Sequence, residues 1–198
     1  SEGAALFADI AGFTALTEAL AFPLEELMAG RQLLSEDPPR HTAMRNIVNR
    51  GFTPRRIAMW EPRIRDFARG YMNEMRQAEE IDLVAAVAMP LPVRVICEML
   101  GVEPERQDDF KRWTDRIIAG TTGSTRNVDP LTSGFADAMR ELSEYIPGAA
   151  AERTKRPSED LISVLLAAQD DGAGLSAAEM VLFVLLLLVA GNETTTNL

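Results

Sequence analysis

The sequence contains one cysteine, Cys97, and one histidine, His41, among 198 residues. These counts exclude an internal disulfide bond and any metal site built from several cysteines or several histidines. Positive charge is also scarce, because 20 lysines and arginines stand against 30 aspartates and glutamates, for a formal net charge of −10. A general nucleic-acid-binding protein needs positive charge to neutralise phosphates, so we expect no nucleic-acid partner.

Long hydrophobic runs are absent as well. The most apolar stretch is residues 180–191, and its 12 residues fall short of the roughly 20 that a membrane-spanning helix needs. The first twenty residues lack the basic start of a signal peptide. We therefore expect no membrane span and a cytoplasmic location, and we interpret residues 180–191 as a helix that is buried on all sides.

Helical patterns dominate what is present, and the chain is long enough for one domain or a piece of a larger one. A single short strand is expected, over residues 5–10. The fold class expected is mainly α. Ser158 is expected to cap one helix, and Ser176 with Glu179 forms a capping box for the last one. The expected helices cover residues 14–20, 23–29, 40–50, 54–76, 81–89 (buried), 92–100, 104–119 (with Phe110, Trp113, Ile117 and Ile118 on one apolar face), 131–155, 161–169 and 177 onward.

The first motif that carries chemistry is Asp-Pro-Pro-Arg-His-Thr-Ala-Met-Arg at residues 37–45. His41 and Arg45 are four residues apart, so they project from the same face of a helix. A histidine one turn from a permanent cation suits a pair of carboxylates or phosphates. The alternative is that both side chains lie on an ordinary solvated face.

The second motif is Ala-Gly-Asn-Glu-Thr-Thr-Thr at residues 190–196, directly after the apolar run. Gly191 would let a ligand approach the backbone, and Thr194 can hydrogen-bond to a carbonyl of its own helix. An acid, Glu193, beside this hydroxyl in a dry site could relay protons. The alternative is that the helix emerges into solvent at Asn192.

Together these motifs resemble those of the cytochrome P450 family, particularly its soluble bacterial members. The resemblance rests on residues 37–57, 90–102 and 160–198, in the family's order and spacing. It implies the N-terminal part of the P450 fold, truncated within the long central helix. The domain division that follows is an atypical N-terminal segment over residues 1–30 and a partial P450 domain over residues 31–198.

The resemblance implies specific roles for residues of both motifs. His41 and Arg45 would hold the propionates of a haem b, and Ala190 and Gly191 would lie over its distal face. Glu193 and Thr194 would be the catalytic acid–alcohol pair that delivers protons during oxygen activation. The reaction implied is hydroxylation of an apolar small molecule with O2, in the oxidoreductase class of monooxygenases.

Substrate and electron donor follow from the same resemblance. The Gly-Asn-Glu-Thr-Thr sequence at residues 191–195 is similar to that of members acting on steroids or long alkyl chains. Electrons would come from a ferredoxin or flavodoxin-type partner. Such partners are acidic, so exposed basic residues are candidate contacts; those proposed are Arg40, Arg50, Arg55 and Arg56.

One departure from the family pattern concerns the iron ligand. The family binds iron through a cysteine thiolate in a loop near its C-terminal end, and no such loop occurs in this sequence. Cys97 lies in an apolar helical pattern and is expected to be a core residue, so no metal ligand is assigned. We expect this chain to be a fragment that neither binds haem through a thiolate nor turns over by itself.

Two other function classes remain open from the sequence. Residues 6–20 resemble the first strand and helix of class III nucleotidyl cyclases, in which Asp9 would bind metal ions. The second metal-binding aspartate of those enzymes follows a glycine, and the sequence contains no Gly-Asp pair. A third, non-enzymatic interpretation is an acidic helical domain that binds a partner protein through exposed apolar surface.

Overall fold

The computed structural model describes residues 33, 36–76, 80–123, 134–168 and 174–196. Every regular element within these ranges is helical, which confirms the expected mainly α fold. The strand expected over residues 5–10 and the segment 1–30 lie outside the described residues. The helices are α4 (Arg40–Gly51), α5 (Pro54–Met75), α6 (Pro90–Leu100), α7 (Gln107–Gly123), α8 (Phe135–Lys155), α9 (Leu161–Ala167) and α10 (Ala177–Thr196), with a π-helical turn η1 (Val84–Ala88) and a 3-10 turn η2 (Pro104–Arg106).

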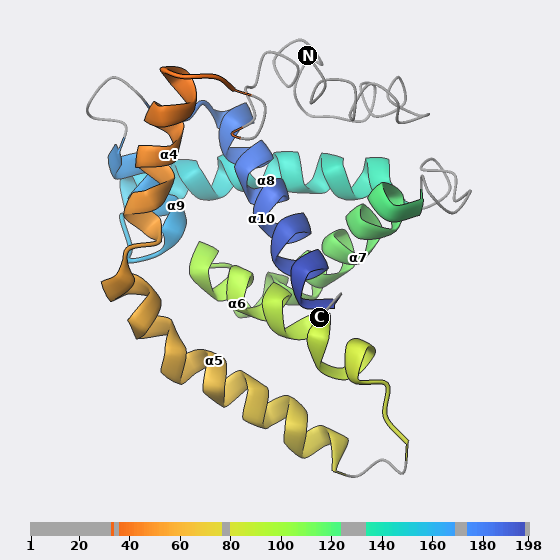
Figure 1. Ribbon diagram of the computed structural model, residues 1–198. Helices are drawn as coiled ribbons and strands as arrows, with labels where there is room; N and C mark the ends of the chain where they lie inside the picture. The colour runs from red at the N-terminus through yellow and green to blue at the C-terminus, as the bar shows by residue number, and fades with distance from the viewer. Residues whose placement is uncertain (1–32, 34–35, 77–79, 124–133, 169–173, 197–198) are drawn as a thin grey trace.

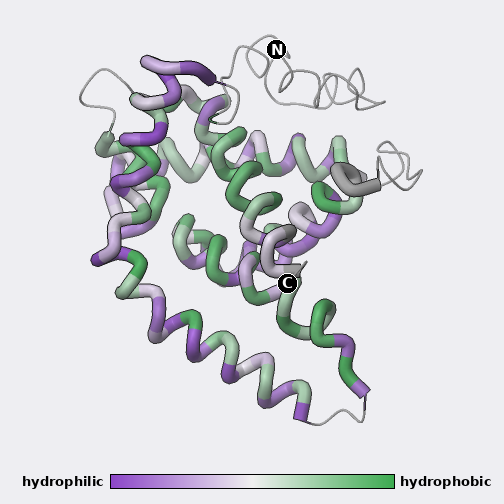
Figure 2. The backbone as a smooth tube through the Cα atoms, viewed as in Figure 1, coloured by the Kyte–Doolittle hydropathy of each residue, from purple (hydrophilic) through white to green (hydrophobic). Residues whose placement is uncertain are grey.

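Helix α10 passes through the centre of the molecule and contacts α6, α7 and α8 (Figure 1). Its first half is apolar on all sides (Figure 2), and Val181, Val184 and Leu188 have no exposed surface. This confirms the expectation of a buried helix up to Leu188. The expectation of burial on all sides is wrong beyond Leu188, because Ala190 is exposed. Among the described residues, no helix has both the length and the hydropathy to cross a membrane.

Helices α7 and α8 form the other main contact of the core. The expected apolar face of α7 is confirmed, since Phe110, Trp113 and Ile117 have no exposed surface. Buried Trp113 keeps a hydrogen-bond partner because its indole Nε1 donates to the Glu141 carboxylate at 2.7 Å. Complete burial of three large side chains ties α7 firmly to the centre of the fold.

Two short segments differ from the expectation. Residues 81–89 were expected to form a buried helix, but the helical element there covers only residues 84–88, the π-helical turn η1. The segment is not buried, since Leu83, directly before η1, is 63% exposed and Val84 is 43% exposed. The segment lies at the far end of the α5–α6 pair, where few elements surround it (Figure 1). Helix α5 runs along the outer edge of the molecule, and it contacts α6 and η1.

The N-terminus of α9 corrects a second expectation. Asp160, not Ser158, is its N-cap, and the Asp160 carboxylate accepts a hydrogen bond from the Ser163 N–H at 2.7 Å. Ser158 lies two residues too early to reach the free N–H groups of the first turn. Its hydroxyl instead donates to the Asp160 carboxylate at 2.6 Å. The capping box of α10 is confirmed by reciprocal bonds between Ser176 and Glu179.

Asp160 also holds together the ends of three helices. Gly101 ends α6 with a φ of +71°, as its place after Leu100 predicted. A Cβ at Gly101 would lie 2.5 Å from Oδ2 of Asp160. Arg153, near the end of α8, donates to the Asp160 carboxylate and, at 2.8 Å, to the Gly101 carbonyl. The ends of α6, α8 and α9 therefore meet at one buried ion pair.

Acid is expected to destabilise the fold through Asp160 and Glu179, which are 8% and 6% exposed. Burial alone would raise the pKa of both groups. Hydrogen bonds from Ser158 and Arg153 to Asp160, and from Arg40 to Glu179, outweigh burial and lower each pKa below its ordinary value. A carboxyl group with a lowered folded-state pKa stabilises the fold fully above its unfolded pKa of about 4, and this stabilisation is lost as pH falls further.

The measurement for this prediction is the urea midpoint of unfolding between pH 7 and pH 3. We expect the midpoint to fall below about pH 4, and to fall less steeply in the Asp160→Asn, Glu179→Gln double variant. Equal slopes in the two proteins would contradict the assignment of acid sensitivity to these two groups.

Candidate functional site

His41 and Arg45 lie on one flank of α4, as their spacing predicted. The adjoining face of the helix carries Met44 and Ile47, which are 2% and 4% exposed and belong to the core. His41 is half-buried and Arg45 is exposed. Neither side chain forms a hydrogen bond or an ion pair with another residue that the structure describes. A neutral or cationic imidazole and a guanidinium are thus available side by side for an anionic ligand.

Arg40 fixes α4 against the start of α10. Its guanidinium donates to Oε1 of Glu179 at 2.6 Å, and it also lies 3.4 Å from the Gly174 carbonyl oxygen. Glu179 belongs to the capping box, so one carboxylate serves the helix start and the ion pair. The proposed role of Arg40 as a contact for an acidic partner is therefore corrected, because its charge is already paired inside the fold.

A small apolar gap continues this contact along the two helices. It measures about 20 Å³ and is lined by Met44 and Val48 of α4 and by Leu182, Phe183 and Leu186 of α10, among others. These contacts establish which face of α10 is turned toward α4. Residues four apart share a helix face, so that same face continues beyond Leu186.

Ala190 and Thr194 are the next two residues on that face, one and two turns beyond Leu186. Both are exposed, so the α4-facing side of α10 is open at its C-terminal end. The Thr194 hydroxyl donates to the Ala190 carbonyl at 2.8 Å, which is the bond expected from the sequence. Glu193 lies in α10 between them, and its side chain is outside the described atoms.

Gly191 and Asn192 point in other directions. A Cβ at Gly191 would lie 3.0 Å from Cδ1 of Ile96 in α6, so the glycine allows these two helices to approach closely. Asn192 is 2% exposed, and its Nδ2 donates to the Met89 carbonyl at 3.4 Å. The alternative in which α10 emerges into solvent at Asn192 is therefore wrong. Sequence analysis missed this contact, although a polar amide directly after a long apolar run was a signal for it.

Cys97 is a core residue, as expected. It lies in α6 with 1% of its surface exposed, and burial raises the pKa of its thiol to about 12. A thiol this reluctant to ionise is a poor ligand and a poor nucleophile. Over the described residues, no three His, Cys, Asp or Glu side chains gather in a way that could hold a metal ion.

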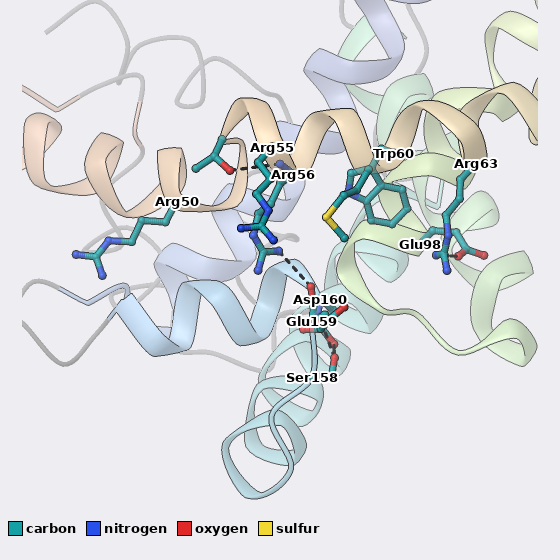
Figure 3. Close-up of a pocket in the computed structure, with 11 residues that line it drawn as sticks. Arg50, Arg55, Arg56, Trp60, Arg63, Glu98, Ser158, Glu159 and Asp160 are labelled. Carbon is teal, nitrogen blue, oxygen red and sulfur yellow. Dashed lines mark hydrogen bonds and ion pairs between the residues drawn. The ribbon is translucent and has the colours of Figure 1, made fainter.

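A separate cavity of about 590 Å³ lies between α5, α6 and the turn before α9. Arg55 and Arg56 extend from α5 toward Glu159 and Asp160 (Figure 3), and the Arg56 guanidinium donates to the Glu159 carbonyl at 3.2 Å. Three arginines at this cavity, Arg50, Arg55 and Arg56, were proposed from the sequence, whereas Arg63 was not. The four arginines share the lining with three acids, Glu98, Glu159 and Asp160, and Arg63 forms an ion pair with Glu98 at 3.2 Å.

Comparison with known proteins decides the family. The chain is 40% identical over 167 residues to cytochrome P450 109 of Bacillus spizizenii, covering 84% of the chain and 41% of that protein. It is 39% identical over 165 residues to the steroid C26-monooxygenase of Mycolicibacterium smegmatis, covering 83% and 38%. The chain is homologous to bacterial cytochromes P450. No protein-family model matches it.

The P450 fold is supported independently by structure. The crystal structure of CYP109E1 from Bacillus megaterium in complex with testosterone superposes with a TM-score of 0.71 at 40% identity. That superposition covers 84% of this chain and 44% of the crystallised one. The chain spans less than half the length of the two P450 proteins named above, in agreement with the partial P450 domain expected from the sequence.

The P450 relatives settle the enzyme class of the family but not every hypothesis from the sequence. The steroid C26-monooxygenase places the family among the oxidoreductases. Nothing found favours the nucleotidyl cyclase alternative, and Asp9 lies outside the described residues. The division into residues 1–30 and 31–198 stays a prediction.

The described residues fit a haem in their donor chemistry. His41 and Arg45 offer donors for two carboxylates, and they have no competing partner in the described chain. The open end of α10 presents a small side chain, Ala190, and a hydroxyl, Thr194, where a flat ligand would need room above it. An axial thiolate is the component that these residues do not supply, because Cys97 is buried within α6.

Proposed function

We propose that this chain forms part of a haem-thiolate monooxygenase that hydroxylates an apolar small molecule. The observation that carries the proposal is that two groups of site residues lie on two helices, α4 and α10, that face each other. His41 and Arg45 lie on α4 with no side-chain partner among the residues that the structure describes, and Ala190 and Thr194 lie exposed on the side of α10 turned toward α4. When bound, a haem b would supply the oxidising chemistry that activates O2.

Each residue of the site has a proposed role. His41 and Arg45 would bind the propionates of a haem by charge-assisted hydrogen bonds. Ala190 would leave space for the ligand, with Gly191 next to it in sequence. The Thr194 hydroxyl donates to the Ala190 carbonyl, which leaves its oxygen able to accept a hydrogen bond from a proton donor. Glu193 and Thr194 together would hold and pass protons.

The proposed substrate is an apolar small molecule such as a steroid or a long-chain alkyl compound. Support comes from relatives: one is a steroid C26-monooxygenase, another is a vitamin D(3) 25-hydroxylase, and CYP109E1 was crystallised with testosterone. We also expect the cytoplasmic location predicted from the sequence.

The proposed electron donor is an acidic protein of the ferredoxin or flavodoxin type. Arg55 is exposed, and with Arg50, Arg56 and Arg63 it lines the cavity on α5. Charges at such a rim steer association and lose effect in salt. Arg40 is left out of this surface because Glu179 already pairs with it.

Replacing Thr194 with alanine is expected to uncouple oxygen use from hydroxylation in the haem-loaded protein. The change removes the hydroxyl at the open face and leaves the helix intact, since alanine favours helices. Proton transfer by a positioned group contributes about 100-fold or more, so product formed per O2 consumed should fall at least about tenfold. The Thr195→Ala variant is the matched control. It removes the same kind of hydrogen bond, from the Thr195 hydroxyl to the carbonyl four residues earlier, that of Gly191. Unchanged coupling in Thr194→Ala would remove Thr194 from the proton path.

The isolated 198-residue chain is expected to give no thiolate-type Soret band in a reduced carbon-monoxide difference spectrum. Its one cysteine is buried in α6 and keeps its proton. A band at the thiolate position would contradict this expectation, because Cys97 would then have to be the ligand.

A non-enzymatic role is the second candidate, and one observation favours it. Large apolar side chains on α5 and directly before η1 are exposed, including Met59 at 61% and Leu83 at 63%, and exposed apolar surface can bind a partner protein. Haem incorporation that depends on His41 and Arg45 would decide against this candidate.

A further inference from the structure

Helix α10 has no hydrophobic stripe that could determine how it is rotated about its own axis. Residues 180–189 are apolar at every position, so no boundary between an apolar and a polar face selects one rotation of this helix. In such helices a single polar or small residue can select one arrangement, as a buried asparagine selects the register of a coiled coil. The rotation matters because it decides which residues face α4.

We propose that Gly191 and Asn192 are positioning residues that set the rotation of α10 against α6 and η1, so that Ala190 and Thr194 face the open side. Successive helix residues differ by about 100°. Asn192 is therefore about 160° away from Ala190 around the helix axis. The Asn192 contact thus lies on the far side of α10 from Ala190 and Thr194, and Gly191 lies between the two sides.

Asn192 supplies the polar part of this positioning. Its side chain is 2% exposed, and the amide reaches the Met89 carbonyl at the junction of η1 and α6, 103 residues away in sequence. A buried amide that lost this partner would carry a desolvation cost. Rotating α10 would break the bond, so the native rotation is favoured over its neighbours.

Gly191 supplies the steric part. The hydrogen of this glycine faces Cδ1 of Ile96, and a methyl group there would meet that carbon at 3.0 Å. Only glycine lets α10 approach α6 in this rotation without moving Ile96. This inference rests on the proposed function only for the use made of Ala190 and Thr194; the positioning itself needs no bound haem.

A variant cycle between Gly191 and Ile96 tests the steric part on the 198-residue chain. Ile96→Val removes Cδ1 and thereby opens the space that a methyl group at position 191 needs. In the Ile96→Val background, Gly191→Ala should raise Tm by about 2–4 °C, because alanine favours helices. In the Ile96 background the same change should leave Tm unchanged or lower it. An equal shift in both backgrounds would overturn the steric part.

Thiol labelling tests the orientation directly, because Cys97 is buried and unreactive while the protein is folded. Maleimide should label an Ala190→Cys variant at least tenfold faster than a Leu188→Cys variant. Adding Asn192→Ala should reduce that ratio at least threefold. The control is Thr114→Val, which removes a buried polar group elsewhere, a hydroxyl bonded within α7, and should leave the ratio unchanged.

The outcomes separate this proposal from the proposed function. A labelling ratio that Asn192→Ala does not change would overturn the positioning role, whether or not the protein binds haem. If Asn192→Ala instead unfolds the chain, Cys97 itself becomes reactive, and the variant cycle between Gly191 and Ile96 then decides. Haem affinity that does not depend on His41 and Arg45 would refute the proposed function, but it would leave the proposal on the rotation of α10 unaffected.

Discussion

The His41→Ala, Arg45→Ala double variant is expected to lose haem affinity by about 100-fold or more. Each residue would make a hydrogen bond to a charged propionate, and losing such a bond costs about 1.5–3 kcal/mol. Since 1.4 kcal/mol corresponds to a factor of ten, the two losses together reach at least that size. The effect is measured by titrating haem into the apo form of the P450 that carries these residues and following the Soret absorbance.

The matched control is the Thr42→Ala, Asn46→Ala double variant. Its two residues are also four apart on α4, and both are exposed, but their face is shifted around the helix from that of His41 and Arg45. This control should keep the affinity of the unmodified protein. Equal losses in the two double variants would show that α4 itself had been damaged, and unchanged affinity in the first would refute the propionate assignment.

Gly101→Ala is expected to destabilise the fold by about 3 kcal/mol or more. Part of the loss arises because a residue with a Cβ is strained by about 1–2 kcal/mol at a left-handed φ. The larger part arises because that Cβ would lie 2.5 Å from the Asp160 carboxylate. Asp160 must then move away from Arg153, and disrupting a buried ion pair costs about 3–5 kcal/mol. Thermal unfolding followed by circular dichroism should show a Tm lower by roughly 10 °C.

Gly134→Ala is the control for backbone strain alone. Gly134 has a φ of +72°, almost equal to that of Gly101, but its Cβ would meet only the flexible side chain of Arg116, at 3.1 Å. We expect a loss of about 1–2 kcal/mol there. Similar losses at both glycines would mean that the Asp160 junction adds nothing beyond the strain.

The helices were predictable because their signals are local. Thr53 followed by Pro54 starts α5, and the Thr53 hydroxyl accepts a hydrogen bond from the Arg56 N–H. Gly101 ends α6 because its left-handed φ favours glycine. The spacing of Phe110, Trp113 and Ile117 gave the buried face of α7. Each of these features depends on residues within one or two turns.

Contacts between residues far apart in the sequence could not be predicted from such local signals. Arg40 looked like a free surface cation, yet it pairs with Glu179, 139 residues away. Burial of residues 81–89 was predicted from their apolar composition, but a segment is buried only where other elements surround it. Gly191 was interpreted as an opening for a ligand, and its missing side chain faces Ile96 instead.

The sequence by itself determined the helical fold, the start of α5 and the end of α6, the core role of Cys97 and the two motifs that resemble those of a cytochrome P450. These depend on periodicity, capping and residue chemistry, which are properties of short segments. Only the tertiary structure decided which side of α10 is open. An apolar run carries no information about its own rotation, and α10 acquires its orientation from Ile96, Met89 and Arg40, which lie on other parts of the chain.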